Sequence, residues 1–164
     1  VKMPANLAVF NPGKAFALQD ELPPANHWLL SGHSLGGAMA CKAVDDNRDK
    51  AVAIILLAAY ADDKDNLANW PHPVLSVSAE FDDLATAADL QAAEYLLPPP
   101  YRMASTADFP MPPGIQTFYY EIPGGNHAQF GNYGEQEGDG QATISAGEQQ
   151  AVVIDIISQF INRL

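Results

Sequence analysis

The chain has 164 residues, of which 48% are hydrophobic, enough for one domain with an apolar core and too few for two full ones. Eight Lys and Arg residues against 20 Asp and Glu residues give a formal net charge of −12. This charge repels phosphate backbones, so nucleic acid is not an expected partner. The single cysteine, Cys41, excludes an internal disulfide and a multi-cysteine metal site. We expect no membrane span, and residues 1–6 show no signal peptide, which leaves the localisation unknown.

Apolar runs alternate with helix-like stretches in the first half of the chain. Residues 27–31 predict a short buried strand, and residues 36–45 predict a helix of small residues directly after it. Residues 51–59 are apolar throughout, and residues 73–79 form the next such run, as in strands that helices cover on both faces. The alternation predicts an α/β fold with a mostly parallel sheet, in a single domain spanning residues 1–164.

The second half of the chain predicts two helices and one further strand. An Ala- and Leu-rich helix over residues 84–97 is stopped by three prolines, and residues 116–122 read as the fourth strand. The last helix is the best marked, because Ser145 and Glu148 have the spacing of a capping box. Its apolar stripe, which should pack on the sheet, comprises Val152, Val153, Ile156, Ile157, Phe160, Ile161 and Leu164.

Two irregular segments have no clear regular structure. The proline-rich stretch 95–114 carries four large apolar side chains, and we weigh an apolar lid over a site against a long surface loop. These side chains are Tyr101, Met103, Phe109 and Met111. The acidic, Gly-rich segment 131–140 is expected to be a long loop, and its three acidic side chains fit a solvated surface better than a calcium site. They are Glu135, Glu137 and Asp139.

Residues 32–36, Gly-His-Ser-Leu-Gly, match the G-x-S-x-G pattern between a predicted strand and a predicted helix. A nucleophile must project from a turn so tight that its neighbours cannot carry large side chains, and the glycines meet that demand. Ser34 is therefore the candidate nucleophile, and the Leu35 amide is the candidate oxyanion donor at the start of the helix. The alternative is a bystander serine in a Gly-rich turn.

Serine needs a general base, and elimination among the four histidines selects His127. His27 precedes the nucleophile strand, His33 is expected to point away from Ser34, and His72 lies at the wrong end of its strand. His127 follows the last predicted strand, at the carboxyl edge of the sheet where Ser34 also lies. The alternative for a loop histidine is a solvated side chain without a role.

The acid that orients the base should follow the third predicted strand, where Asp82 is the candidate. Asp83 would serve if the turn were shifted by one residue, and Asp62 or Asp63 would serve if the acid followed the preceding strand. A purely structural alternative is that this Asp pair caps the next helix, a role that we expect for Asp83 in any case.

Three segments carry a resemblance to a known family: Gly-His-Ser-Leu-Gly-Gly-Ala-Met-Ala at 32–40, Glu-Phe-Asp-Asp-Leu-Ala-Thr at 80–86 and Gly-Gly-Asn-His-Ala-Gln-Phe-Gly-Asn-Tyr-Gly at 124–134. Together they resemble the bacterial α/β hydrolases related to dienelactone hydrolases and small carboxylesterases. The resemblance covers nearly the whole chain and implies a mostly parallel sheet with helices on both faces.

Matched residue by residue, the resemblance implies that Ser34 is the nucleophile, Asp82 the acid and His127 the base. Asp83 stands where the family usually has glycine or proline. Family members carry several strands before the nucleophile strand and a loop that gives a second oxyanion N–H, and this sequence shows at most a remnant of them. We expect these residues to be the C-terminal part of a longer polypeptide; a second chain that supplies the strands and a minimal hydrolase are the alternatives. The strand near Trp28 would then be an open sheet edge, so we expect a homodimer or a partner chain to pair with it.

The sequence thus predicts a serine hydrolase that cleaves a small-molecule carboxylic ester through Ser34, Asp82 and His127, with no cofactor and no metal. Thioester, lactone or amide cleavage would need the same residues. The competing interpretation is a catalytically silent or incomplete hydrolase fold that serves as a binding or assembly module, or that needs a second chain to complete the site.

Overall fold

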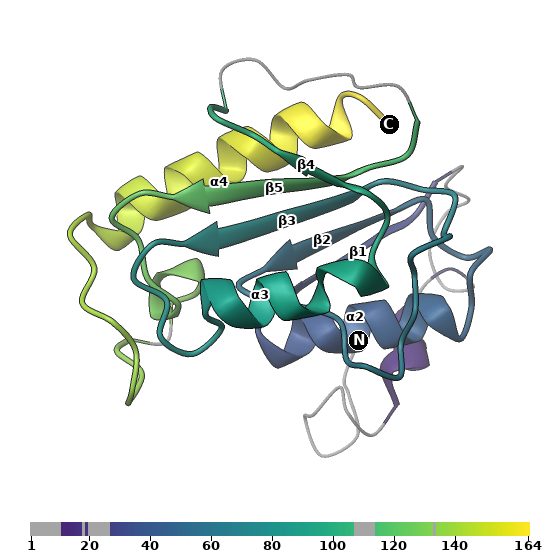
Figure 1. The fold of residues 1–164 in the computed structure, drawn as a ribbon, viewed down its shortest axis with the longest axis horizontal. Helices are drawn as coiled ribbons and strands as arrows, with labels where there is room; N and C mark the ends of the chain where they lie inside the picture. The colour runs from purple at the N-terminus through teal and green to yellow at the C-terminus, as the bar shows by residue number, and fades with distance from the viewer. Residues whose placement is uncertain (1–10, 18, 20–26, 107–113, 133) are drawn as a thin grey trace.

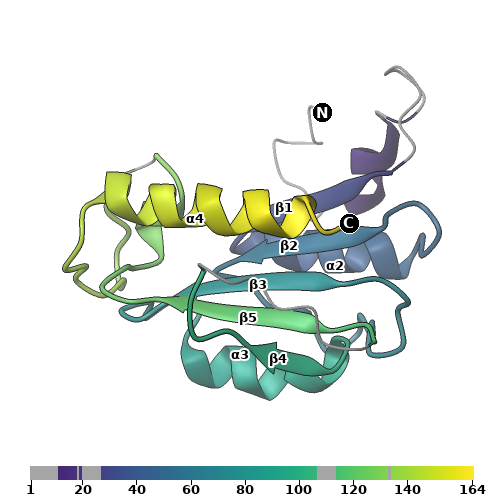
Figure 2. The ribbon, with the colours of Figure 1, turned by 90° about the horizontal axis from the view of Figure 1, so that it is seen from above.

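The computed structural model describes residues 11–17, 19, 27–106, 114–132 and 134–164, which form one five-stranded parallel sheet (Figure 1). The strand order is β1-β2-β3-β5-β4, and Figure 2 shows β1 and β4 at opposite edges. All four strand pairs are parallel. The strands are β1 (Leu29–His33), β2 (Ala53–Leu57), β3 (Val74–Ala79), β4 (Pro100–Arg102) and β5 (Thr117–Ile122).

Helices cover both faces of the sheet, as the unbroken apolar strands predict. Figure 1 shows α4 on one face, with α2 and α3 on the other. The α-helices are α2 (Leu35–Asp45), α3 (Ala87–Ala93) and α4 (Ala146–Ile161). The 3₁₀ helices are η3 (Pro12–Ala17), η4 (Glu94–Leu96) and η5 (Ala128–Phe130). None of the helices in the described ranges is long and apolar enough to cross a membrane.

Each face of the sheet has its own apolar core. On the α2 side, Cys41 and Val44 pack with Ile54, Leu56 and the buried Trp70. On the α4 side, the helix packs on inward-facing residues of β2, β3 and β5, as predicted. The apolar stripe of α4 is shorter than expected, because Phe160 is its last buried member and Ile161 and Leu164 are nearly half exposed. The buried stripe fixes α4 along the strands.

The two helix starts differ in how well the sequence predicts them. The capping box of Ser145 and Glu148 is confirmed at the start of α4. The expected helix over 84–97 is instead α3 followed by η4, and its cap is Thr86 with Asp89 rather than Asp83. The residues before Thr86 form a separate turn, and this turn belongs to the candidate site.

Strands β1 and β4 correct the sequence prediction. β1 begins two residues later than expected and includes Gly32 and His33, because pairing with β2 continues through His33 and Leu57. β4 was expected to be irregular, but Pro100 begins an edge strand, where the missing proline N–H does not interrupt a ladder.

The proposed lid is not seen in the part of its segment that the structure describes. Tyr101 and Met103 pack against the α4 side of the sheet, and Tyr95 is largely exposed. Phe109 and Met111 lie outside the described residues.

Candidate active site

Three loops meet at the carboxyl edge of the sheet because backbone pairing continues past the strand ends. The Ser34 N–H donates to the Leu57 carbonyl at 2.9 Å, beyond the end of β1. The Glu80 N–H, just beyond the end of β3, donates at 3.1 Å to the carbonyl of Ile122, the last residue of β5. The loops that carry the predicted nucleophile, acid and base therefore begin from one continuous backbone ladder.

Ser34 lies in a strained turn between β1 and α2, with φ 54° and ψ −128°, a conformation that non-glycine residues rarely adopt. A Cβ on Gly32 would lie 2.2 Å from the Gly36 carbonyl carbon, and one on Gly37 would lie 2.4 Å from the Ala59 Cβ. Both positions require glycine on steric grounds. Gly32 in the motif and Gly37 directly after it thus allow the close approach of strand and helix that turns the serine outward, whereas a Cβ on Gly36 would meet nothing within 4 Å.

The start of α2 supplies backbone donors next to Ser34. The Ser34 carbonyl accepts from Gly37 at 2.9 Å and Ala38 at 3.3 Å, while Leu35 is the first residue of the helix. First-turn N–H groups have no carbonyl partner within their helix and carry the positive end of its dipole. The Leu35 N–H is therefore in a position that suits an anion at Ser34.

Asp82 and His127 form a buried pair at this edge. His127 Nδ1 lies 3.0 Å from Oδ1 and 2.9 Å from Oδ2 of Asp82, and the two residues are 2% and 5% exposed. Asp82 Oδ1 also accepts from the N–H groups of Leu84 at 2.9 Å and Ala85 at 2.7 Å. The turn of residues 80–85, which we call the acid turn, thus holds the carboxylate in place while the carboxylate holds the imidazole.

The alternative acids lie elsewhere. Asp83 is exposed, and its neighbour Asp82 makes the contact with the imidazole. Asp62 and Asp63 are exposed in the loop after β2, where Asp62 accepts from the Lys64 N–H. Within the described residues, the pairing of His127 favours Asp82 over all three.

The hydrogen bonds of the described residues include none between Ser34 Oγ and His127 Nε2. Such bonds are often long in uncomplexed enzymes and shorten when substrate binds. The structure therefore brings acid and base into contact and places the serine at the same edge, on the adjoining turn.

Gln149 of α4 fixes the loop before His127, a role that the sequence analysis did not predict. Its side chain is fully buried, accepts from the Asn126 N–H at 3.0 Å and donates to the Asn126 carbonyl at 2.8 Å. A Cβ on Gly125 would lie 2.5 Å from the Gln149 Oε1. The available signal was a glutamine one helical turn before the buried Val153, on an otherwise apolar face.

Asp139 also holds this loop, although the sequence suggested that it belongs to a solvated acidic segment. Its carboxylate accepts from the N–H groups of His127 at 3.3 Å and Ala128 at 2.8 Å. Gly140 packs against the acid turn, where a Cβ would lie 2.1 Å from the Phe81 carbonyl oxygen. The loop around Asp139 and Gly140 therefore connects the acid turn to the turn that carries His127. Glu135 and Glu137 are exposed as expected.

His33 lies beside the base, a contact that the sequence did not predict. Its ring centroid is 4.5 Å from that of His127 and 5.7 Å from that of Phe130, and it has a hydrogen bond to the His127 backbone. Burial, followed by the neighbouring His127, lowers the pKa of His33 from 6.5 to about 4. His33 is thus a neutral imidazole at neutral pH, packed against the base.

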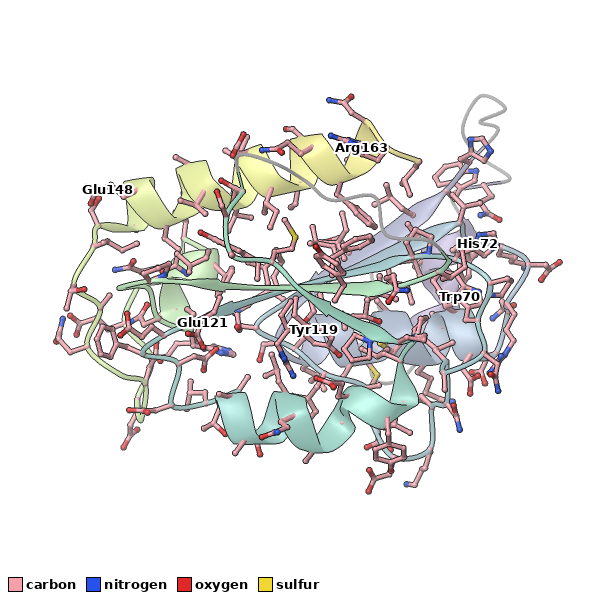
Figure 3. The ribbon with its side chains drawn as sticks, turned by 45° about the horizontal axis from the view of Figure 1, so that its top comes forward. Trp70, His72, Tyr119, Glu121, Glu148 and Arg163 are labelled. Carbon is pink, nitrogen blue, oxygen red and sulfur yellow. The ribbon has the colours of Figure 1, made fainter. Side chains whose placement is uncertain are left out.

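The other nucleophilic and basic candidates lie outside this edge. His27 and His72 line a cavity at the amino ends of the strands, and Figure 3 shows His72 at the end of the sheet opposite Glu121. Burial raises the pKa of the Cys41 thiol to about 12, so this cysteine is not a nucleophile. No group of three or more metal-ligating side chains is found in the ranges that the structure describes.

A small cavity opens at Ser34, with a volume of about 230 Å³. Its walls come from the start of α2, the loop after β2 and the acid turn after β3. The lining residues are Ser34, Leu35, Ala38, Ala58, Ala59, Tyr60, Leu84 and Ala85. A substrate group bound there would lie against the candidate nucleophile.

Solved structures share this fold at low sequence identity. A predicted CIB-like hydrolase from Thermoplasma acidophilum is 13% identical, with a TM-score of 0.60, over 93% of this chain and 59% of that one. The RedJ thioesterase of prodiginine biosynthesis in Streptomyces coelicolor is 12% identical (TM-score 0.54; 88% and 68% covered). Est1E from Butyrivibrio proteoclasticus is 14% identical (TM-score 0.53; 90% and 67% covered).

The chain spans 59% of the length of the Thermoplasma hydrolase and 57% of the length of a putative alpha/beta hydrolase from Agrobacterium tumefaciens, which is less than three fifths of either protein. No curated protein matches the sequence significantly. The model of a family described as the alpha/beta hydrolase family matches residues 1–108 and 111–151. Since this match covers most of the sequence and the sheet has the fold of solved hydrolases, the chain belongs to the alpha/beta hydrolase family.

Proposed function

We propose that this chain is a serine hydrolase that cleaves carboxylic esters through an acyl-enzyme. Ser34 Oγ attacks the ester carbonyl while His127 Nε2 accepts its proton, and the Leu35 N–H donates to the developing oxyanion. His127 then returns the proton to the leaving alcohol. In the second half of the reaction, His127 Nε2 accepts a proton from the water that attacks the acyl-Ser34 carbonyl. It then returns this proton to Ser34 Oγ as the carboxylic acid is released.

The observation that carries this proposal is the buried pair of Asp82 and His127 at the sheet edge that bears the strained Ser34 turn. In this arrangement Asp82 keeps the Nδ1 proton of His127 in place, so that Nε2 is the free base. A buried carboxylate–imidazole pair alone also occurs as a structural feature. The backbone strain at Ser34 and the helix start beside it are what favour a nucleophile.

A covalent probe tests the proposal directly. The purified protein is treated with a fluorophosphonate, the adduct is located by mass spectrometry, and the Ser34→Ala variant is the control. We expect one adduct, on Ser34, and none in the variant. A folded protein that stays unlabelled would refute the proposal.

The competing function, a binding or assembly module, is favoured by one observation. β1 pairs only with β2 among the described strands, so the sheet ends next to the Ser34 turn. An open edge there suits pairing with another chain. Absence of labelling together with self-association would support this function instead.

A further inference from the structure

The cavity at Ser34 combines small size with an apolar rim. Four of its eight lining residues are alanines, which leave the space that larger side chains would fill. Its three large apolar side chains are unusually exposed: Leu35 at 52%, Leu84 at 40% and Tyr60 at 36%. Exposed apolar side chains that gather around one hollow mark a surface that binds an apolar group.

The volume limits what this group can be. Cavities for drug-sized ligands start at about 300 Å³, so a cavity of about 230 Å³ holds only part of such a molecule. At roughly 30 Å³ for each liquid water molecule, taken here as the volume of one carbon with its hydrogens, the cavity has room for a group of at most about eight carbon atoms. A longer chain would have to leave it.

The charges around the cavity limit the group further. None of the eight lining residues is charged, although the chain carries a net charge of −12. An anionic group would lose its hydration without gaining a cationic partner, and the surrounding acidic surface would repel it. The cavity therefore suits an uncharged apolar group.

We infer that this cavity is the acyl site of the enzyme and selects esters of short, uncharged acyl groups of at most about eight carbons. The inference rests on the proposed hydrolysis at Ser34 and names its substrate class. Leu84 and Ala38 are the specificity-determining residues, since one forms the outer rim on the acid turn and the other forms the wall on α2.

The test measures kcat/KM for p-nitrophenyl esters from acetate to dodecanoate. Each methylene that enters an apolar site contributes up to about fourfold, so we expect butyrate to exceed acetate by about tenfold. The rate should stop rising at octanoate and fall for longer chains. The p-nitrophenyl hemisuccinate replaces the butyrate methyl group by a carboxylate, and we expect it to react at least about 100-fold more slowly.

Two variants connect the preference to the cavity. Leu84→Ala opens the rim and should raise the dodecanoate-to-butyrate ratio about fourfold, while Ala38→Leu narrows the wall and should lower the butyrate-to-acetate ratio by a similar factor. Ile154→Ala, at an exposed apolar position on α4, is the matched control and should change neither ratio.

Fluorophosphonate labelling in the same samples separates the two proposals. Labelled Ser34 with the short, uncharged preference supports the inference. Labelled Ser34 with a preference for long or anionic acyl groups, or with ratios that Leu84→Ala and Ala38→Leu leave unchanged, overturns it while the proposed function stands. A folded protein without labelling overturns both.

Discussion

Asp82 and Asp83 are adjacent and chemically identical, and only their surroundings distinguish them. Asp82 is buried against His127 and accepts two backbone N–H groups, whereas Asp83 faces solvent. Sequence reasoning favoured Asp82 and left Asp83 open, because the sequence alone does not show which of the two side chains turns inward. That choice is made by the turn of residues 82–85, which the prediction had placed partly within the next helix.

Asp82→Asn should lower kcat/KM for an ester substrate by about 10³-fold or more, because an amide no longer fixes the proton on His127 Nδ1. Asparagine keeps an oxygen that can accept from the Leu84 and Ala85 N–H groups, so the turn should persist. Asp83→Asn is the matched control and should stay within about twofold of the parent protein. Steady-state kinetics on both variants, with circular dichroism to verify folding, decide the point; equal losses would remove Asp82 from the role of the acid.

His33 makes the stability of the fold depend on pH. Its pKa is about 4 in the folded chain against 6.5 unfolded, so between these values the unfolded chain binds more protons. The free energy of unfolding should therefore fall as the pH drops from 6.5 to 4. With its partial exposure discounted, the contribution is on the order of 1 kcal/mol.

His33→Phe keeps an aromatic ring against His127 and Phe130 but cannot be protonated. We expect urea unfolding of this variant to show a shallower loss of stability between pH 6.5 and 4 than the parent protein. Because the two proteins differ only at position 33, the difference between the two curves isolates His33. Parallel curves would show that His33 takes up its proton equally in the folded and unfolded states.

At the scale of elements, α4 both covers the sheet and holds the loop of the base. Gln149→Leu removes both hydrogen bonds to Asn126 and leaves its backbone groups unpaired in a buried place. We expect a loss of about 2 to 4 kcal/mol in the free energy of unfolding and slower fluorophosphonate labelling of Ser34.

Gln159→Leu provides the matched control on the same helix, because its side chain only donates to Asp155 at the surface. Its effect should stay below about 0.5 kcal/mol. Urea denaturation monitored by tryptophan fluorescence measures both variants. If the two substitutions destabilised the protein equally, the two hydrogen bonds to Asn126 would not explain why Gln149 is buried.

The elements that the sequence predicts well are those with a local signal. The unbroken apolar runs give β2, β3 and β5, and the capping box gives the start of α4. β4 has no such signal, because Pro98, Pro99 and Pro100 normally end regular structure and only the open edge of β5 makes a strand acceptable there. Asp139 and Gln149 were missed for a related reason: their partners lie more than ten residues away and become neighbours only in the folded chain.

At the scale of the whole molecule, the parallel sheet brings the candidate residues to one edge. Ser34, Asp82 and His127 follow β1, β3 and β5, and the carboxyl ends of parallel strands share an edge. This placement was predictable from the strands alone, because it depends on their direction and not on their order. The direct contact between Asp82 and His127 depends on β3 and β5 being neighbours, which their separation by α3 and β4 in the chain does not reveal.

The sheet edge at β1 and the net charge have opposite effects on the association of two copies of the chain. Among the described strands β1 has a neighbour on one side only, and an edge strand favours pairing on its other side, while a charge of −12 on each copy repels the other. Because salt screens the repulsion but hardly affects backbone hydrogen bonds, association should strengthen between 0.05 and 0.5 M NaCl, concentrations over which the Debye length falls from roughly 14 to 4 Å.

Ser31→Lys tests whether β1 is the pairing surface, since Ser31 is exposed on this strand and a lysine on an edge strand disfavours strand addition. We expect the variant to weaken self-association by about tenfold or more in sedimentation velocity at 0.5 M NaCl. Ala151→Lys adds the same charge at an exposed position of α4 and should not weaken it. A monomer at every protein and salt concentration, or equal effects of the two lysines, would exclude pairing of copies through β1, and the edge would then be open to a different chain or to none.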